Sequence, residues 1–252
     1  MIDQKTLAYI NLYAVLGALE NLCDLAPEAK EILTNKKPIS IGFEVKGGPS
    51  ATLTFYKGKC RMEQGCSNCD VKLPFSSCEK FNGLIDGTVT PIPSKGFQHI
   101  GFLLKDFTSL TDLLNKYMRP GEEDLKDPEF FRINTILTLY VVGVAICQVG
   151  NNDEIGKFSA SNIIDGSVMI EIKGKEAVEV VAKNHRLVCL KKRPQNYKCS
   201  MVFGDYETAN ALFGGRVNAM VCIGEGKVEM HGLNSMLDNV NRILDRVGLY
   251  LA

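Results

Sequence analysis

The residue pattern best suited to chemistry in this chain is a Cys-x-x-Cys motif formed by Cys66 and Cys69. Two thiols at this spacing can bind a soft metal ion or cycle as a redox pair. Cys60 and Cys78 lie nearby in the sequence, so a four-thiolate site is a second interpretation. A zinc ribbon usually has a second Cys-x-x-Cys motif, which this region lacks. We therefore predict a reduced pair of loop thiols without a metal, and keep a thiol or metal site at Cys60 to Cys78 as an alternative.

The other cysteines bear on the cellular compartment. The chain has nine cysteines, an odd number, spread over both halves. Residues Met1 to Thr6 contain neither a basic cluster nor a small-residue cleavage site. Free thiols without an export signal are typical of a reducing compartment. We therefore predict a cytoplasmic protein, with several cysteines serving as small apolar residues in the core.

The residues that commonly serve as acids, bases and nucleophiles do not converge on a recognised motif. His99, His185 and His231 are the only histidines, and none lies beside a recognised nucleophile motif. The chain has no GxGxxG sequence and no glycine-rich phosphate loop followed by lysine. We expect His231 to occupy an exposed strand position. The sequence thus predicts a protein that is not an enzyme and needs no cofactor.

The composition describes an ordinary globular protein. Lysine plus arginine and aspartate plus glutamate number 29 each, and 45% of the residues are apolar. This balance argues against a nucleic-acid partner, which would favour a basic surface. The longest apolar run, Ile136 to Val149, is shorter than the roughly 20 residues that span a bilayer, so we predict a buried helix there.

The elements that must position these residues occur twice in the sequence. Glu79, Asn82 and Gly87 recur 128 residues later as Glu207, Asn210 and Gly215. At a spacing of 127, Leu12, Tyr13 and Val15 return as Leu139, Tyr140 and Val142. Solenoid and propeller repeats are far shorter, roughly 20 to 50 residues. The spacing therefore indicates a duplicated domain, with a first domain over 1–119, a linker over 120–129 and a second domain over 130–252.

Within the first half, the hydrophobic period changes in a regular order. Apolar residues at helical spacing predict a helix over Leu7 to Leu25, and the matching helix of the second half runs from about Phe130 to Val149. Alternating residues such as Ile41, Phe43 and Val45 predict a meander of strands. A helix, a short strand around Phe97 to Leu103 and a last helix complete the half. The fold class is therefore α+β, with two similar domains, each an antiparallel sheet of about five strands covered by helices.

In this order the residues resemble the sterol carrier protein type 2 family, once in each half. The matching segments are Gly48 to Phe55 with Lys57-Gly58-Lys59, Cys69 to Leu73 and the Phe81 to Gly87 helix in the first half, and Leu212 to Val217 and Gly226 to Gly232 in the second. The resemblance implies a curved sheet with helices on one face and an apolar tunnel between the two layers. It also implies an acyl chain, a sterol or a similar lipid as the ligand.

The resemblance places the ligand among apolar side chains of both halves. The expected lining residues are Phe75, Phe81, Leu84, Leu110, Leu113 and Leu114 in the first half, and Phe203, Leu212, Phe213, Met236, Val240 and Leu244 in the second. A greasy ligand gains about 25 cal/mol for each Å² of apolar surface removed from water, so such a pocket needs little directional chemistry. The same side chains could instead close on one another as an ordinary core.

The leading functional hypothesis is a non-catalytic binder or carrier of an apolar small molecule. Its partners are that molecule and, transiently, a membrane surface. An alternative is a fused dimer that serves as an interaction or regulatory scaffold without a ligand. The sequence leaves open the ligand, the number of binding halves, the oligomeric state and the placement of the two sheets, although a pseudo-twofold arrangement is natural for a fused pair.

Overall fold

The computed structural model describes residues 2–251 as two compact units, unit 1 (Met1–Ile133) and unit 2 (Asn134–Ala252). The boundary lies inside one long helix, α6 (Pro128–Asn152). The predicted linker, 120–129, contains a short 3₁₀ turn, η4 (Asp124–Lys126), and the first two residues of α6. The domain limits predicted from the sequence stay a prediction.

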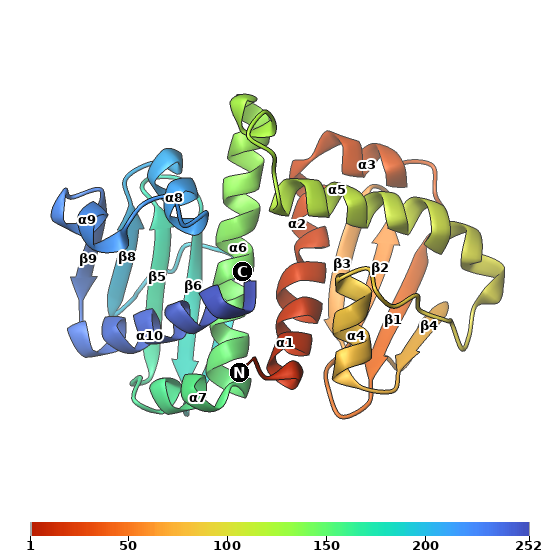
Figure 1. The fold of residues 1–252 in the computed structure, drawn as a ribbon, viewed down its shortest axis with the longest axis horizontal. Helices are drawn as coiled ribbons and strands as arrows, with labels where there is room; N and C mark the ends of the chain where they lie inside the picture. Colours follow the sequence, from red (N-terminus) through yellow and green to blue (C-terminus); the bar gives the residue numbers. More distant parts are fainter. Residues whose placement is uncertain (1, 252) are drawn as a thin grey trace. The chain divides into compact units, whose positions relative to one another are not determined.

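Unit 1 begins with helices, continues with four strands and ends with helices (Figure 1). The elements are α1 (Gln4–Ile10), η1 (Asn11–Leu16), α2 (Ala18–Leu25), α3 (Pro27–Leu33), β1 (Ile39–Val45), β2 (Ser50–Tyr56), β3 (Lys59–Gln64), β4 (Val71–Phe75), α4 (Cys78–Ile85), η2 (Phe97–His99), η3 (Phe102–Phe107) and α5 (Thr108–Met118). The predicted helix over Leu7 to Leu25 is confirmed, as is the meander of the first three strands.

The first helix of unit 1 contains a π-helical section, η1, between α1 and α2. The amide N–H of Gly17 donates to the carbonyl of Leu12, five residues back, at 3.1 Å. A Cβ atom on Gly17 would lie 2.1 Å from the carbonyl oxygen of Tyr13, so no larger residue fits there without a shift. The widened turn also lets the hydroxyl of Tyr13 donate to the carbonyl of Ser50 at the start of β2, at 2.9 Å.

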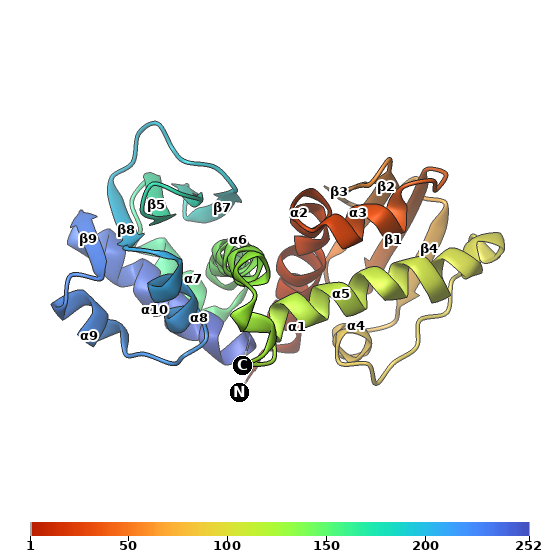
Figure 2. The ribbon, with the colours of Figure 1, turned by 90° about the horizontal axis from the view of Figure 1, so that it is seen from above.

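The sheet of unit 1 has the strand order β3-β2-β1-β4, and its helices lie on one face (Figure 2). Strand β1 pairs antiparallel with β2 but parallel with β4. The prediction of a purely antiparallel sheet of about five strands is therefore wrong for this unit, which has four strands in a mixed sheet. Alternating hydrophobicity reports which face of a strand is buried, but it does not report the direction of the neighbouring strand.

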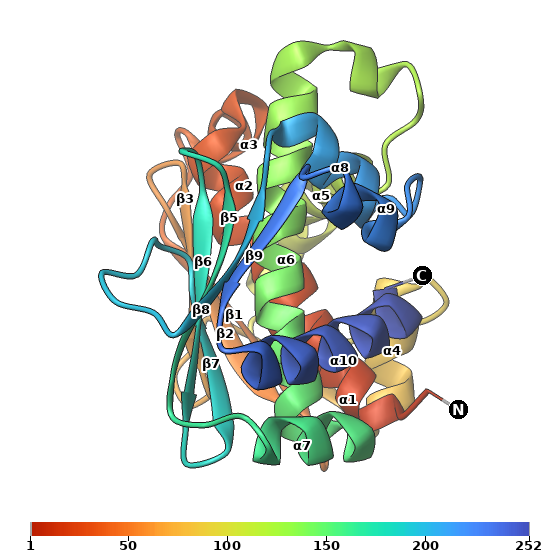
Figure 3. The same cartoon turned by 90° about the vertical axis from the view of Figure 1, so that its left-hand side faces the viewer.

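Unit 2 repeats this order and adds elements near its end. Besides α6, it contains α7 (Glu154–Ser161), β5 (Gly166–Ile172), β6 (Ala177–Lys183), β7 (Arg186–Leu190), β8 (Cys199–Phe203), α8 (Tyr206–Phe213), α9 (Ala219–Gly224), β9 (Val228–Gly232) and α10 (Asn234–Leu251). The strand order is β7-β6-β5-β8-β9, with β8 parallel to β5, so this sheet has five strands but is also mixed. Its helices lie on one side of the sheet (Figure 3).

The predicted short strand around Phe97 to Leu103 is wrong, because that segment is helical in η2 and η3. In unit 2 the strand before the last helix is β9 (Val228–Gly232), which pairs with β8 and corresponds to the residues that end at Gly96 in unit 1. In unit 1 only one bridge remains, between Lys72 and Lys95. The amide of Lys72 donates outward to Lys95, and Pro74, two residues on, has no N–H to continue the ladder. Strand β4 is therefore an edge strand, a position in which a proline is tolerated.

A glycine ends this edge segment in both units. Gly96 has φ +86° and Gly232 has φ +99°. A Cβ atom would lie 2.3 Å from the carbonyl oxygen of Asp70 at Gly96, and 2.2 Å from that of Lys198 at Gly232. Only glycine tolerates both the left-handed backbone and this close approach. The two chain segments therefore return to the start of β4 and β8 in the same way.

Helix α6 confirms the predicted buried helix over Ile136 to Val149. Within residues 2–251 it is the one helix whose length and composition would allow it to cross a membrane. Two thirds of its most apolar window, 67%, is buried inside the structure, which is typical of the core helix of a folded domain.

Candidate functional site

The candidate ligand site of each unit is the layer between the sheet and the helices. Ile41, Phe43 and Val45 alternate along β1 on one face of the sheet, and all three are buried. The ring of Phe43 lies 6.3 Å from that of Phe81 on α4 and 6.1 Å from that of Phe107 on η3. The alternating face of β1 therefore points at the helices, as the sequence predicted.

Aromatic rings fill much of this layer in unit 1. Phe55 on β2 lies 5.6 Å from Phe102 and 6.1 Å from Phe107, measured between ring centroids. Phe75 on β4 packs edge-on against Phe81 at 5.1 Å. These separations are within the range in which rings attract one another beyond their simple burial. Phenylalanines from the sheet, from α4 and from η3 thus close on one another in unit 1.

Unit 2 has smaller side chains at the matching positions. By strand register, Ile170 corresponds to Phe43, because each residue pairs with the equivalent positions of its two neighbouring strands. By the same register, Ala182 corresponds to Phe55. The fourth residue of α8 is Ala209, where α4 has Phe81. Three rings of the unit 1 layer are therefore replaced by an isoleucine and two alanines.

One aromatic contact is shared by the two units. Phe203 on β8 corresponds to Phe75 and packs edge-on against Phe213, at 5.2 Å between centroids. Its partner is the last residue of α8, one helical turn beyond Ala209, so the ring contact has moved towards the end of the helix. Ala209 itself is fully buried.

On the β6 and β7 side of unit 2, two glycines of helix α6 lie close against apolar side chains of the sheet. A Cβ atom on Gly143 would lie 2.9 Å from the side chain of Val178, and one on Gly150 would lie 2.5 Å from that of Leu187. The first helix of unit 1 has Leu16 and Cys23 at the corresponding positions. By register Val178 stands where unit 1 has Ala51, so on this side unit 2 places small helix residues against larger sheet residues.

A buried asparagine fixes α4 and α8 over their sheets. The amide of Asn82 donates to the backbone carbonyl of Gln4, at 3.0 Å, and its oxygen accepts from Asn11 at 3.1 Å. In unit 2 the amide of Asn210 donates to Asn134 at 2.5 Å and to Thr135 at 2.7 Å. Because an unpaired amide would be costly in such a buried place, these bonds hold the short helix in one position.

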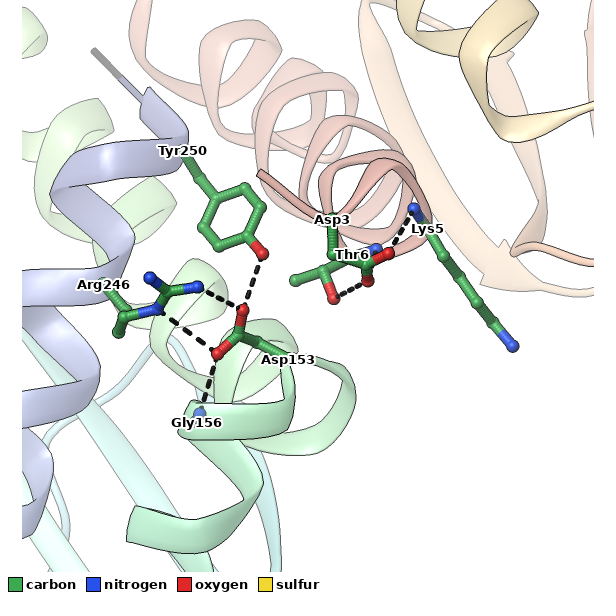
Figure 4. Close-up of polar contacts among 7 residues, drawn as sticks. All are labelled: Asp3, Lys5, Thr6, Asp153, Gly156, Arg246 and Tyr250. Atoms are coloured by element: carbon green, nitrogen blue, oxygen red, sulfur yellow. Dashed lines mark hydrogen bonds and ion pairs between the residues drawn. The ribbon is translucent and has the colours of Figure 1, made fainter. Parts of the chain in front are cut away.

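In unit 2 an ionic cluster joins the start of α7 to α10 (Figure 4). Asp153 caps α7 by accepting from the amide of Gly156 at 2.8 Å, and it also accepts from Arg246 and Tyr250, each at 2.7 Å. Burial by itself would raise the pKa of Asp153. The hydrogen bonds from Arg246, Tyr250 and Gly156 outweigh it and lower that pKa below the ordinary value.

Figure 4 also shows a smaller capping cluster in unit 1, which involves Asp3, Lys5 and Thr6. The carboxylate of Asp3 accepts from the amide of Thr6 at 2.9 Å and from its hydroxyl at 2.5 Å. This arrangement satisfies the free N–H groups at the start of α1. Both clusters fix the starts of helices that belong to the layer.

The residues predicted to line a pocket are divided between buried and half-buried positions. Buried are Phe75, Phe81, Leu110, Leu114, Phe203, Met236 and Val240. Half-buried are Leu84, Leu113, Leu212, Phe213 and Leu244. Burial alone does not distinguish a side chain that lines a pocket from one that fills the core. The pocket-lining role of these residues therefore stays a prediction. Sequence reasoning missed Ile170, Ala182 and Ala209, although the repeat spacing of 127 to 128 would have paired them with phenylalanines.

Exposed apolar side chains gather in two matching segments, each following α4 or α8. Among residues 2–251, nine of the eighteen exposed large apolar side chains lie there: Ile92, Phe97, Ile100 and Leu104 in unit 1, and Val217, Met220, Val221, Ile223 and Leu233 in unit 2. Met220 is 75% exposed on α9, and Ile92 is 76% exposed. Such groups of apolar residues at the surface are typical of contacts with a ligand, a partner or a membrane.

The cysteines are all free thiols, and seven of the nine are buried. This confirms the expectation that several act as small apolar core residues. Burial raises the pKa of Cys23 to about 12 and that of Cys199 to about 11, so these thiols stay protonated at neutral pH. Cys66 and Cys69 lie 3.7 Å apart, measured between their sulfur atoms. No group of three or more cysteine, histidine or acidic side chains suited to a metal occurs within residues 2–251.

His231 lies on β9 with its side chain 63% exposed, as the sequence predicted. Its Nε2 atom is 3.1 Å from the carboxylate of Glu229. Hydrogen bonds from Lys173 and from His231 lower the pKa of Glu229. His231 and Glu229 thus form an exposed polar pair on the edge strand β9.

Comparisons with known proteins find similar solved structures. One is a ubiquinone synthesis protein described as UbiJ-SCP2, at 17% identity and a TM-score of 0.33, over 43% of this chain and 93% of that chain. Another is the sterol carrier protein domain 2 of Helicoverpa armigera, at 11% identity and a TM-score of 0.36, over 44% of this chain and 87% of that chain. A third is the inverting sec-alkylsulfatase Pisa1 of a Pseudomonas species, at 11% identity and a TM-score of 0.25, over 57% of this chain and 28% of that chain.

No protein-family model and no curated protein matches the sequence. At TM-scores of 0.25 to 0.36, the three structural similarities assign neither a family nor an activity to this chain.

Proposed function

We propose that the protein is a non-catalytic carrier of an apolar small molecule, such as a fatty acyl chain or a sterol, and that unit 2 holds the ligand. In this proposal the chain is a tandem duplication of a domain of the sterol carrier type. One observation carries the assignment to unit 2: at three matched positions of the layer, unit 1 has Phe43, Phe55 and Phe81, and unit 2 has Ile170, Ala182 and Ala209.

The physical reason is the volume of the side chains. Protein interiors are packed to the density of organic crystals, so rings that occupy a layer leave no room for a ligand. Where rings are absent, an apolar ligand can supply the missing contacts and remove its own surface from water. We therefore assign ligand binding to unit 2 and a supporting role without a ligand to unit 1.

The exposed apolar segments support a route for the ligand. In unit 2 they lie on α9 and just before α10, next to the strand and helix that complete the layer. An apolar surface at this place can contact a membrane transiently while an acyl chain enters or leaves. The proposal places this transfer in the cytoplasm, where the nine cysteines stay reduced.

The first experiment is mass spectrometry of the gently purified full-length chain, native and then denatured with organic extraction. We expect one equivalent of an apolar molecule, or uptake of one equivalent of a fluorescent fatty acid by delipidated protein. No adduct and no uptake of either fatty acids or sterols would overturn the carrier proposal and favour the ligand-free interaction scaffold.

A matched pair of variants tests which unit binds. Ala209→Phe introduces into unit 2 the ring that α4 carries in unit 1, and Phe81→Ala removes that ring from unit 1. We expect uptake of the fluorescent fatty acid to fall at least tenfold in Ala209→Phe and to persist in Phe81→Ala. Circular dichroism of both variants controls for folding. Retained uptake in a folded Ala209→Phe, with loss in Phe81→Ala, would move the site to unit 1.

A further inference from the structure

A pair of thiols lies on the face of the unit 1 sheet that is turned away from the helices. Cys66 and Cys69 belong to the connection from β3 to β4, strands at opposite edges of the sheet, so this connection must cross it. It passes over Gly42 of β1. A Cβ atom on Gly42 would lie 2.2 Å from the sulfur of Cys66 and 2.6 Å from that of Cys69. Both sulfurs therefore occupy the space that a side chain at position 42 would take.

Hydrogen bonds hold this connection at both ends. At its start, the hydroxyl of Thr52 on β2 donates to the carbonyl of Gly65 at 2.8 Å. At its end, the carboxylate of Asp70 accepts from the amide and the hydroxyl of Ser40 on β1, at 2.8 and 2.7 Å. These bonds to Ser40 also lower the pKa of Asp70. The two thiols are thus held over Gly42 by bonds to the neighbouring strands.

A second backbone contact holds Cys69 itself. The ammonium group of Lys95 donates to the carbonyl of Cys69 at 2.5 Å. Cys69 is only 6% exposed, whereas Cys66 is more open to solvent. The pair therefore consists of one accessible thiol, Cys66, and one buried thiol, Cys69, in a connection that hydrogen bonds hold in place.

Unit 2 shows that the fold does not require this pair. By register, Met169 of β5 stands at the position of Gly42 and is buried. The matching connection, 191–198, contains no cysteine. At this position unit 2 therefore has one buried methionine side chain, whereas unit 1 has a glycine with two thiols packed over it. The dithiol is an addition to the shared architecture.

We propose that Cys66 and Cys69 form a reversible intramolecular disulfide by exchange with a low-molecular-weight disulfide such as oxidised glutathione. The thiolate of Cys66 attacks one sulfur of the small disulfide, forms a mixed disulfide and releases one small thiolate. The thiolate of Cys69 then attacks the sulfur of Cys66, closes the protein disulfide and releases the second small thiolate. The two protons lost by the protein protonate the released thiolates, so the products are one protein disulfide and two small thiols.

The geometry suits the second step. The two sulfurs are 3.7 Å apart, and a disulfide bond is about 2.05 Å long, so closure needs a movement of less than about 2 Å. The attacking sulfur of Cys69 already faces Cys66. Oxidation at this site therefore produces the internal disulfide in preference to a lasting mixed disulfide.

The charge environment makes this exchange slow at neutral pH. Burial, the neighbouring Cys69 thiol and the Glu44 carboxylate together raise the pKa of Cys66 to about 11, while Lys72 acts in the opposite direction. Only the thiolate attacks, so the rate rises with pH up to that pKa. Exchange at this pair is therefore slow at neutral pH and becomes faster as the pH rises.

The test incubates the full-length chain with excess oxidised glutathione, blocks free thiols with iodoacetamide and maps the peptides by mass spectrometry. We expect the peptide that contains Cys66 and Cys69 to lose two hydrogen atoms and to resist alkylation, and dithiothreitol to restore both thiols. Cys147 and Cys189 of unit 2, which also interact through their thiols, serve as an internal comparison in the same digest.

Two single variants, Cys66→Ser and Cys69→Ser, remove one partner each with little change in size. We expect Cys69→Ser to stop at a mixed disulfide with glutathione on Cys66, and Cys66→Ser to leave Cys69 far less modified, because Cys69 is buried. Full alkylation of both cysteines in the wild-type chain after oxidation, or only a lasting mixed disulfide on Cys66, would overturn the proposal.

Discussion

Unit 1 and unit 2 share the order and register of four strands, yet they fill the layer under the helices differently. Unit 1 places phenylalanines at three matched positions where unit 2 has an isoleucine and two alanines. One backbone arrangement thus supports two packings that differ in ring content at these positions. In the carrier proposal, this difference in side-chain volume assigns the scaffold role to unit 1 and the ligand to unit 2.

The two units also differ in how their second helix begins. Helix α3 starts at Pro27 after Ala26, and no side chain caps it. Helix α7 starts after Asp153, whose carboxylate accepts from Gly156, Arg246 and Tyr250. Proline presets the helical φ angle, whereas the aspartate ties the helix end to a distant helix. In unit 2 a carboxylate therefore joins the start of this helix to α10, whereas no side chain caps the matching helix of unit 1.

The largest effect should follow from Phe81→Ala in unit 1. Removing this fully buried ring, which packs against Phe43 and Phe75, should lower the free energy of unfolding of unit 1 by about 3–5 kcal/mol. Urea unfolding of the full chain, followed by circular dichroism, measures it. Ala209→Gly, at the same helix position of unit 2, should cost only about 1 kcal/mol. Equal losses would contradict the contrast between the two layers.

A somewhat smaller effect should follow from Asp153→Asn in unit 2. The change removes the charge that accepts from Arg246 and Tyr250, and should cost about 2–3 kcal/mol of unfolding free energy at neutral pH. The control is Asp205→Asn, because Asp205 caps α8 through Thr208 alone. We expect it to cost a few tenths of a kcal/mol, since asparagine is also a good cap.

The same aspartate predicts a pH dependence. Its pKa in the folded state is depressed, so the stability it contributes is present above the unfolded pKa and is lost as pH falls through the folded pKa. Unit 2 should therefore lose stability as the pH falls below about 4, and Asp153→Asn should flatten that part of the curve. An unchanged acid profile in the variant would show that the cluster is not responsible.

A third change probes the place of the dithiol. Gly42→Ala puts a methyl group within 2.2 Å of the sulfur of Cys66, and should cost about 1–3 kcal/mol by overpacking. In a Cys66→Ala and Cys69→Ala background the same change should cost much less, because both sulfurs are gone. The difference is the coupling energy, measured by chemical unfolding of the four proteins. A coupling near zero would mean that the sulfurs do not occupy the space above Gly42.

The smallest effect should follow from Pro74→Val, which gives β4 the residue type found at Val202 of β8. A new amide N–H at position 74 would point outward, as that of Lys72 does, and could extend the single bridge to Lys95. We expect a stability change of no more than about 1 kcal/mol, with slowed amide exchange around 72–74. Val202→Pro in unit 2 is the matched reverse, and should speed exchange along β9. Fast exchange at position 74 would show that proline alone does not end the sheet.

Much of the local structure followed from the sequence. Alternation of Ile41, Phe43 and Val45 predicted the buried face of β1, and the helical spacing of Leu110, Leu114 and Tyr117 predicted α5. These patterns have the period of the element itself, so they depend on neighbours in sequence. The strand around Phe97 to Leu103 failed, because a short apolar run fits a helix and a strand equally well.

The pairing of strands and the partners of buried polar groups came from the tertiary structure. The direction of β4 beside β1, the position of two sulfurs over Gly42 and the bonds of Asp153 to α10 all join residues far apart in sequence. Such contacts depend on how the chain returns to the sheet, which no local period encodes. The sequence by itself determined most of the elements, the 127 to 128 spacing and the difference in ring content. Only the tertiary structure decided that the exchanged residues face one layer, because strand register places two of them and the packing of α4 and α8 on their sheets places the third.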